Sequence, residues 1–181
     1  MGLAVVGRLT QRKVFKILAR AASVVVAMTV AVNSHGLKAG DAFPELMGRY
    51  MNGNGFYSSD LPSGAKVVNF FWVECQPCKK ELPLLARKQA QYPDVSFIAA
   101  HPEPDPETGE DYERSVIKAF VDGLPAAPRH TIALTHRAKE QYGIDAYPIT
   151  LLINAEDKVE AVLRGLDTNT INTLERWLRQ Q

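Results

Sequence analysis

The hydrophobic and polar positions between Lys66 and Leu85 predict a buried strand that runs directly into a helix. Residues 66–71 form an apolar run with β-branched and aromatic members, the pattern of a strand buried on both faces. From Cys78 onward the sequence is rich in Lys, Glu and Leu, and a helix is expected to continue to about Lys88. Pro83 falls inside that helix, where it is expected to produce a kink.

The remaining pattern predicts two hairpins, further strands and further helices. Residues 48–51 and 55–58 flank the sequence Asn52-Gly53-Asn54, which is a hairpin signal. The other predicted strands are 95–100, 131–134, 149–154 and 159–163, and the last two of these form the second hairpin. Helices are predicted at 110–122, at 135–143 and from Asp167 onward. The segment from His101 to Pro106 is rich in proline and is predicted to be irregular.

This order of elements predicts an α/β fold with a mixed central sheet and helices on both faces. Parallel strands joined by helices are followed by an antiparallel pair and a terminal helix. The arrangement is that of the thioredoxin fold, with an N-terminal β-hairpin extension and a central insertion.

The first 34 residues differ in charge and hydropathy from the rest of the chain. Their basic residues precede any acidic residue and are Arg8, Arg12, Lys13, Lys16 and Arg20. An apolar run follows at 21–32, too short for an ordinary membrane-spanning helix. This pattern predicts a signal peptide, with an uncleaved membrane anchor as the alternative. The chain therefore divides into residues 1–34, signal or anchor, and residues 35–181, the folded domain.

The folded part of the chain is mildly acidic. Without the five basic residues of the N-terminal segment, 16 basic residues face 20 acidic ones, for a net charge of −4. Nucleic acid is therefore not expected as a partner, because its binding needs a basic surface. An export signal also implies an oxidising compartment, where a pair of nearby cysteines is oxidised unless something reduces it.

The only two cysteines of the chain, Cys75 and Cys78, lie between the central strand and the start of the helix. A helix N-terminus favours an anion, so the pKa of a Cys75 thiol is expected to fall well below its usual value of roughly 8.5. Cys78 lies one turn further along, close enough to form a disulfide with Cys75. Pro77 falls in the first turn, where its missing N–H costs nothing. The sequence therefore predicts a redox-active dithiol.

Three other interpretations of the cysteine pair are weaker. A purely structural disulfide across so short a loop constrains the unfolded chain little and contributes little stability. A structural zinc site needs four ligands, and the four histidines show no ligand spacing beside the single Cys pair. A peroxiredoxin is not expected either, because that family needs Thr three residues before its reactive Cys, where this chain has Trp72.

Residues 37–181 resemble the exported thioredoxin-like proteins of the TlpA/ResA/CcmG (DsbE) type. The motifs that carry the resemblance are Gly40-Asp41-Ala42-Phe43-Pro44, Val67-Val68-Asn69-Phe70-Phe71-Trp72, Cys75-Gln76-Pro77-Cys78-Lys79-Lys80-Glu81-Leu82-Pro83, Tyr142-Gly143-Ile144 and Tyr147-Pro148-Ile149-Thr150-Leu151-Leu152-Ile153-Asn154. The resemblance covers essentially the whole of the predicted mature chain.

The resemblance implies a periplasmic thiol–disulfide oxidoreductase in which Cys75 and Cys78 are catalytic. A reductant role of the cytochrome c maturation type is favoured over an oxidant role. The peptide bond before Pro148 is expected to be cis, with an ordinary trans proline as the alternative. The residues expected to meet the substrate are Trp72, Glu74, Gln76, Pro77, Tyr147 and Pro148.

The same resemblance implies which partners the protein has. They are a Cys-containing exported protein as substrate and a membrane or periplasmic donor or acceptor of disulfides. The protein itself is expected to be a monomer without a metal or cofactor. An alternative of a different class is a copper-holding module that uses Cys75, Cys78 and one histidine, for which His101 is the candidate.

Three positions depart from the family pattern. Glu74 replaces the usual aromatic residue before the first cysteine. It either raises the pKa of Cys75 or points into solvent. Asn69 stands where thioredoxin itself has a buried acid, so no carboxylate for proton transfer is expected from that position. Tyr147 is bulkier than the usual residue before the proline and is expected to alter the partner groove.

Overall fold

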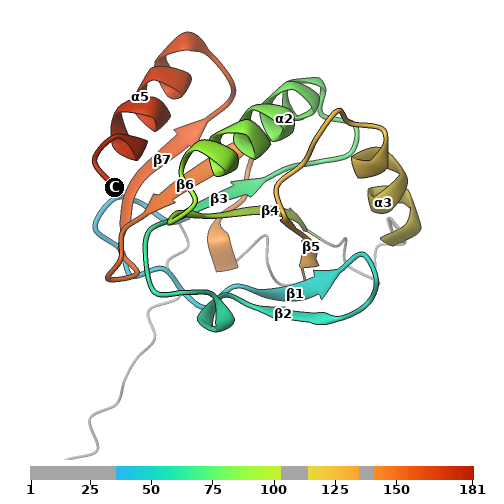
Figure 1. The fold of residues 1–181 in the computed structure, drawn as a ribbon, viewed down its shortest axis with the longest axis horizontal. Helices are drawn as coiled ribbons and strands as arrows, with labels where there is room; N and C mark the ends of the chain where they lie inside the picture. The colour runs from blue at the N-terminus through green and yellow to red at the C-terminus, as the bar shows by residue number, and fades with distance from the viewer. Residues whose placement is uncertain (1–35, 103–113, 135–140) are drawn as a thin grey trace, which may run out of the picture. The chain divides into compact units, whose positions relative to one another are not determined.

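The computed structural model describes residues 36–102, 114–134 and 141–181, which form a seven-stranded mixed sheet with helices packed on it (Figure 1). The strands are β1 (Met47–Tyr50), β2 (Gly55–Tyr57), β3 (Lys66–Phe70), β4 (Ser96–Pro102), β5 (His130–Leu134), β6 (Ile149–Ile153) and β7 (Val159–Arg164). The helices are α2 (Gln76–Gln91), α3 (Arg114–Asp122) and α5 (Thr168–Leu178), with a short 3₁₀ turn, η1 (Ser58–Asp60). The predicted thioredoxin fold is confirmed.

The strand order is β2-β1-β5-β4-β3-β6-β7, so the strand that leads into the cysteine pair is central. β3 runs parallel to β4 and antiparallel to β6, and its five residues are all buried. In this register Asn69 lies between Ala99 of β4 and Thr150 of β6. Three segments that are distant in sequence therefore meet beside the start of α2.

The two faces of the sheet are covered by different parts of the chain. The three described helices pack on one face (Figure 1). There, apolar side chains of α2, α3 and α5 form clusters with alternate strand residues such as Val67, Phe97 and Ala133. The opposite face carries Val68, Phe70 and Ile98, among others, and is covered by a cluster that includes Phe43, Leu46, Tyr142 and Ile144. The period of two along each strand produces this division.

Several element boundaries differ from the predicted ones. β4 continues through His101 and Pro102, which the proline-rich composition had assigned to irregular structure. Parallel pairing with β5 explains the difference, because Ala133 and Leu134 extend the ladder opposite these two residues. α2 runs past Pro83 to Gln91, and its central proline does not end it.

Other predictions fall on residues outside the described part of the chain. These are the N-terminal segment 1–34, most of the irregular segment 101–106, the first four residues of the helix predicted at 110–122 and residues 135–140 of the next predicted helix. Among the residues that the structure does describe, no helix is both long enough and apolar enough to cross a membrane.

The described chain begins against the loop that precedes β6. Gly143 has a φ of 62°, and a Cβ added there would lie 1.9 Å from the Cα atom of Gly36. Only glycine allows two backbones to approach so closely in this conformation. Further on, the N–H of Gly40 donates to the carbonyl of Val159 at 2.7 Å, and Ala42 forms a bridge with Lys158. This N-terminal arm thus supports both β7 and the loop that leads to Pro148.

Candidate active site

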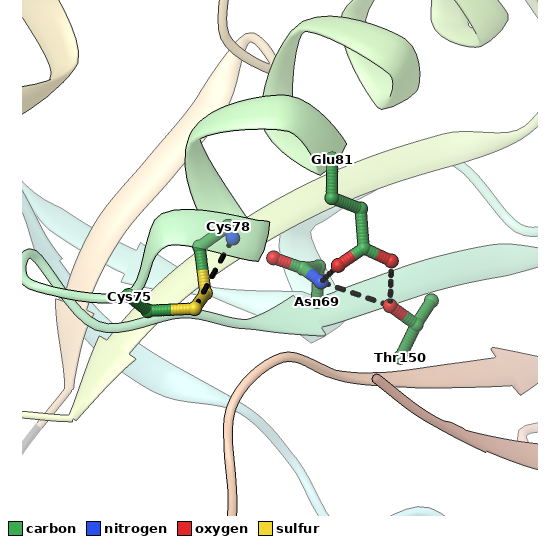
Figure 2. The surroundings of a disulfide bond; sticks show 5 residues. All are labelled: Asn69, Cys75, Cys78, Glu81 and Thr150. Atoms are coloured by element: carbon green, nitrogen blue, oxygen red, sulfur yellow. Dashed lines mark hydrogen bonds between the residues drawn. A yellow bond between two sulfur atoms is a disulfide. The ribbon is translucent and has the colours of Figure 1, made fainter. Parts of the chain in front are cut away.

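Cys75 and Cys78 form a disulfide at the N-terminus of α2, with an S–S distance of 2.02 Å (Figure 2). Cys75 is the N-cap residue, and the backbone N–H of Cys78 donates to its Sγ at 3.1 Å. Pro77 lies in the first turn, as predicted. Cys75 is partly exposed whereas Cys78 is completely buried, so a partner can approach only the first sulfur directly. This difference favours Cys75 as the nucleophile.

A stack of three rings lies beside the disulfide. The indole of Trp72 stacks on His101 at a centroid distance of 4.6 Å and on Tyr147 at 5.6 Å. Tyr147 precedes Pro148, and the peptide bond between them is cis, as predicted. Tyr147 and Cys75 both pack against the apolar cluster that contains Cys78. The structure therefore brings two predicted substrate-binding residues, Trp72 and Tyr147, together near the dithiol.

The other predicted substrate-binding residues differ in exposure. Glu74, Gln76 and Pro77 surround the cysteines on the surface, while Pro148 is buried. The carbonyl of Pro148 accepts a hydrogen bond from the N–H of Gly165 at 2.8 Å. The exposed residues can contact a partner directly, and the hydrogen bond from Gly165 fixes the position of the buried Pro148.

His101 lies deeper than the sequence predicted. It belongs to β4 rather than to a loop, has no exposed surface and packs its ring against both Phe71 and Trp72. Within the described ranges, no group of three or more His, Cys, Asp or Glu residues is arranged to hold a metal ion. No observation therefore favours the copper-holding alternative.

Glu81 was not among the residues predicted for the site, and it is the most unusual residue there. It lies on α2, one turn after Cys78, and only 4% of it is exposed. Its carboxyl group accepts hydrogen bonds from the Thr150 hydroxyl at 2.9 Å and from the Asn69 amide at 3.0 Å. Burial raises the pKa of Glu81 from 4.5 to about 7, and the two hydrogen bonds only partly oppose this shift.

The spacing of α2 does contain a signal for Glu81. Cys78, Leu82 and Leu85 are buried, and position 81 shares their face because residues three and four apart are neighbours on a helix. A carboxylate on the apolar face of a helix is unusual and marks a candidate functional group. The side chain reaches Asn69, so a carboxyl group from α2 lies beside the position where thioredoxin has its buried acid (Figure 2).

Comparisons with known proteins agree with this geometry. No family model matches the chain. The thiol-disulfide oxidoreductase ResA of Bacillus subtilis is 25% identical over 146 residues, which cover 78% of this chain and 76% of that protein. The protein of the same name from Oceanobacillus iheyensis is 26% identical over 126 residues, which cover 66% of this chain and 58% of that protein.

The solved structures support the fold. A DsbE-type thiol:disulfide interchange protein from Chlorobium tepidum superposes with a TM-score of 0.63 at 21% identity, covering 80% of this chain and 97% of that one. With the Cys75–Cys78 pair at the start of α2, these similarities support a thioredoxin-fold thiol–disulfide oxidoreductase similar to the TlpA/ResA/CcmG type.

Proposed function

We propose that the protein is an exported reductant that transfers electrons from its Cys75–Cys78 dithiol to disulfides of exported proteins, in the manner of cytochrome c maturation. The observation that carries the exchange chemistry is the pairing of a partly exposed Cys75 with a buried Cys78 and a buried carboxyl group, Glu81. The direction of electron flow follows from the resemblance to the TlpA/ResA/CcmG type.

The proposed reaction has two exchange steps. The Cys75 thiolate attacks one sulfur of the partner disulfide, and the second partner sulfur leaves as a thiolate that takes a proton from water. Cys78 then loses its proton and attacks Sγ of Cys75. This forms the internal disulfide and releases the first partner sulfur as a thiolate. Two electrons pass from the dithiol to the partner.

Glu81 is proposed to take up the Cys78 proton in the second step. The group has a pKa of about 7 and is therefore divided between its two protonation states at neutral pH, as an efficient acid or base requires. Its position one turn from Cys78 on the same helix supports this role. The rate of partner release is therefore expected to rise with pH through about 7.

The proposed partner surface consists of Trp72, Glu74, Gln76, Pro77 and the Tyr147–Pro148 loop. An extended partner peptide is proposed to dock on this surface and to place its disulfide against Cys75. Export to the periplasm is proposed from the N-terminal segment 1–34, either as a cleaved signal or as an anchor. The donor that re-reduces the dithiol is proposed to be a membrane or periplasmic protein, and the enzyme to act as a monomer.

The direction of electron flow is tested by the reduction potential of the dithiol. Purified protein equilibrated with mixtures of reduced and oxidised glutathione reports this potential through the fraction of Cys75–Cys78 disulfide. A value near or below that of thioredoxin, about −270 mV, supports the reductant. A value near that of DsbA, about −120 mV, would overturn it in favour of an oxidant.

The order of the two cysteines is tested separately. A Cys78→Ala variant should accumulate a mixed disulfide with a synthetic peptide that contains an internal disulfide, because Cys75 attacks and nothing resolves the product. The matched Cys75→Ala variant should form no such adduct. Adducts in Cys75→Ala alone would reverse the assignment.

Mass spectrometry of fractionated cells shows whether residues 1–34 are retained and where the protein resides.

A further inference from the structure

The amide oxygen Oδ1 of Asn69 is among the buried side-chain atoms of the site for which no hydrogen-bond partner is found in the part of the chain that the structure describes. Asn69 has no exposed surface, and its Nδ2 donates to Thr150 at 2.8 Å and to Glu81 at 3.0 Å. A buried acceptor without a donor is costly, and native structures rarely leave one without a reason.

The orientation of this amide is fixed by the chemistry of its neighbours. When Glu81 is ionised it can only accept, so the single hydroxyl proton of Thr150 is donated to Glu81 and Thr150 can only accept a hydrogen bond from Asn69. The NH₂ group must therefore face Thr150 and Glu81, and Oδ1 must point away from both. Figure 2 shows Oδ1 on the side of the amide where the Cys75–Cys78 disulfide lies.

The group that changes most on that side is Cys78. In the disulfide its sulfur carries no proton and offers no donor. Reduction breaks the S–S bond with two electrons, and one of the two protons taken up must reside on Cys78 if that thiol is neutral. Cys78 is completely buried, so its new S–H donor cannot turn to water and needs an acceptor inside the protein.

We propose that Asn69 Oδ1 accepts the hydrogen bond from the S–H group of Cys78 when the dithiol is reduced. The acceptor is then unpaired only in the oxidised protein, and its pairing stabilises the reduced one. The same amide holds Glu81 through its NH₂ group, which positions that carboxyl group relative to the thiol. This inference rests on the proposed function, because it assumes that the protein cycles between disulfide and dithiol.

The test is the S–H stretching band of Cys78 in the infrared spectrum. The chain has only two cysteines, so a Cys75→Ala variant contains a single thiol and gives one S–H band. Asn69→Leu in this background removes the acceptor while keeping a side chain of similar shape. The band should move to higher frequency, because the S–H bond is no longer weakened by an acceptor.

Two further variants separate this contact from a general disturbance of the site. Thr150→Val removes a neighbouring hydrogen bond but leaves Oδ1, so the band should stay where it is in Cys75→Ala. Asn69→Asp retains an oxygen at the same place and should also keep the band at low frequency. If Asn69→Leu does not fold, Asn69→Ala takes its place. The same band position with and without the Asn69 acceptor overturns the proposal.

The reduction equilibrium supplies a second readout in the wild-type background. Without the acceptor in Asn69→Leu, the equilibrium constant for reduction should fall about tenfold, which corresponds to a potential about 30 mV lower. An unchanged or higher potential contradicts the proposal. An unchanged potential in Asn69→Leu would leave the proposed function standing, because peptide exchange by Cys75 is measured independently. Conversely, a band shift without any peptide exchange would leave the Asn69 contact intact and remove the proposed function.

Discussion

The two ends of strand β3 both bury a polar side chain, and they satisfy it in different ways. At the first end, the Lys66 side chain is 7% exposed, and its Nζ lies 2.6 Å from the Asp157 carboxylate, which is itself 59% exposed. At the other end, Asn69 and Glu81 are buried together with Thr150, and none of their hydrogen-bond partners among the described residues is cationic.

The difference shows how one strand can carry a structural group and a reactive one. Lys66 forms an ion pair with a carboxylate that remains in contact with water, and this pairing offsets part of the cost of burying the lysine side chain. The donors to Glu81 in the described part of the chain, Asn69 and Thr150, are neutral, and burial raises its pKa to about 7. The site thus has a group that gains and loses a proton near neutrality, and it lies at the end of β3 that meets the cysteines.

The largest expected effect is on exchange by Glu81→Gln. Loss of a positioned base typically costs 10²–10⁴ in rate, so release of the mixed disulfide should slow by roughly 10³-fold at pH 7. The rise of the release rate through pH 7 should disappear as well. Stopped-flow measurement with the disulfide peptide between pH 5 and 9 checks both. A variant that keeps the wild-type pH profile would falsify the role of Glu81.

The second expected effect is a loss of folding stability as pH rises, caused by Glu81. Because the folded pKa of Glu81 is raised from 4.5 to about 7, the folded protein binds more protons than the unfolded chain between these values. Its contribution to stability therefore falls as pH rises from about 4.5 to 7, by on the order of 3 kcal/mol in total. Urea unfolding of the oxidised protein should show this loss, and Glu81→Gln should lack it. If the free energy of unfolding depends on pH in the same way in the wild type and in Glu81→Gln, the raised pKa of Glu81 is contradicted.

A substitution at the Lys66 end of β3 should change the free energy of unfolding and leave peptide exchange unchanged. Asp157→Asn removes the counter-ion of Lys66. The lysine ammonium group then keeps its hydrogen bond to the carbonyl of Gly64 at 3.2 Å. Asparagine tolerates the φ of 55° at this turn, so the backbone should not change. Because Asp157 is half exposed, the expected loss is about 1 kcal/mol in the free energy of unfolding. Peptide exchange should keep its wild-type rate, and a slower rate would show that the two ends of β3 are coupled.

The smallest effect is expected from Thr150→Val. The hydroxyl of Thr150 lowers the pKa of Glu81, so its removal should raise that pKa further. The midpoint of the pH profile for partner release should move to higher pH, and the rate at pH 7 should fall about threefold, as for the loss of one neutral hydrogen bond. A midpoint that moves to lower pH would show that the hydroxyl does not stabilise the carboxylate.

The local pattern of the sequence was enough to predict the main elements of the fold and the dithiol. The apolar run of β3, the cysteine pair and the following helix are adjacent in the chain, and the Asn52-Gly53-Asn54 turn specifies its hairpin locally. Alternation of side chains along a strand and the spacing along a helix are set by backbone geometry. These features need no information from distant residues.

Only the tertiary structure decided what surrounds the dithiol. Glu81 meets Asn69 and Thr150 because β3 and β6 pair in one particular register, which places residues 69 and 150 side by side. His101 was assigned to a loop because its strand is completed by pairing with β5 and not by its own sequence. The pKa of a carboxyl group depends on burial and on nearby donors. The two donors to Glu81 are Asn69 and Thr150, which lie 81 residues apart in the sequence. The sequence of α2 places Glu81 on the buried face, but only the packing of the sheet determines what that carboxyl group meets.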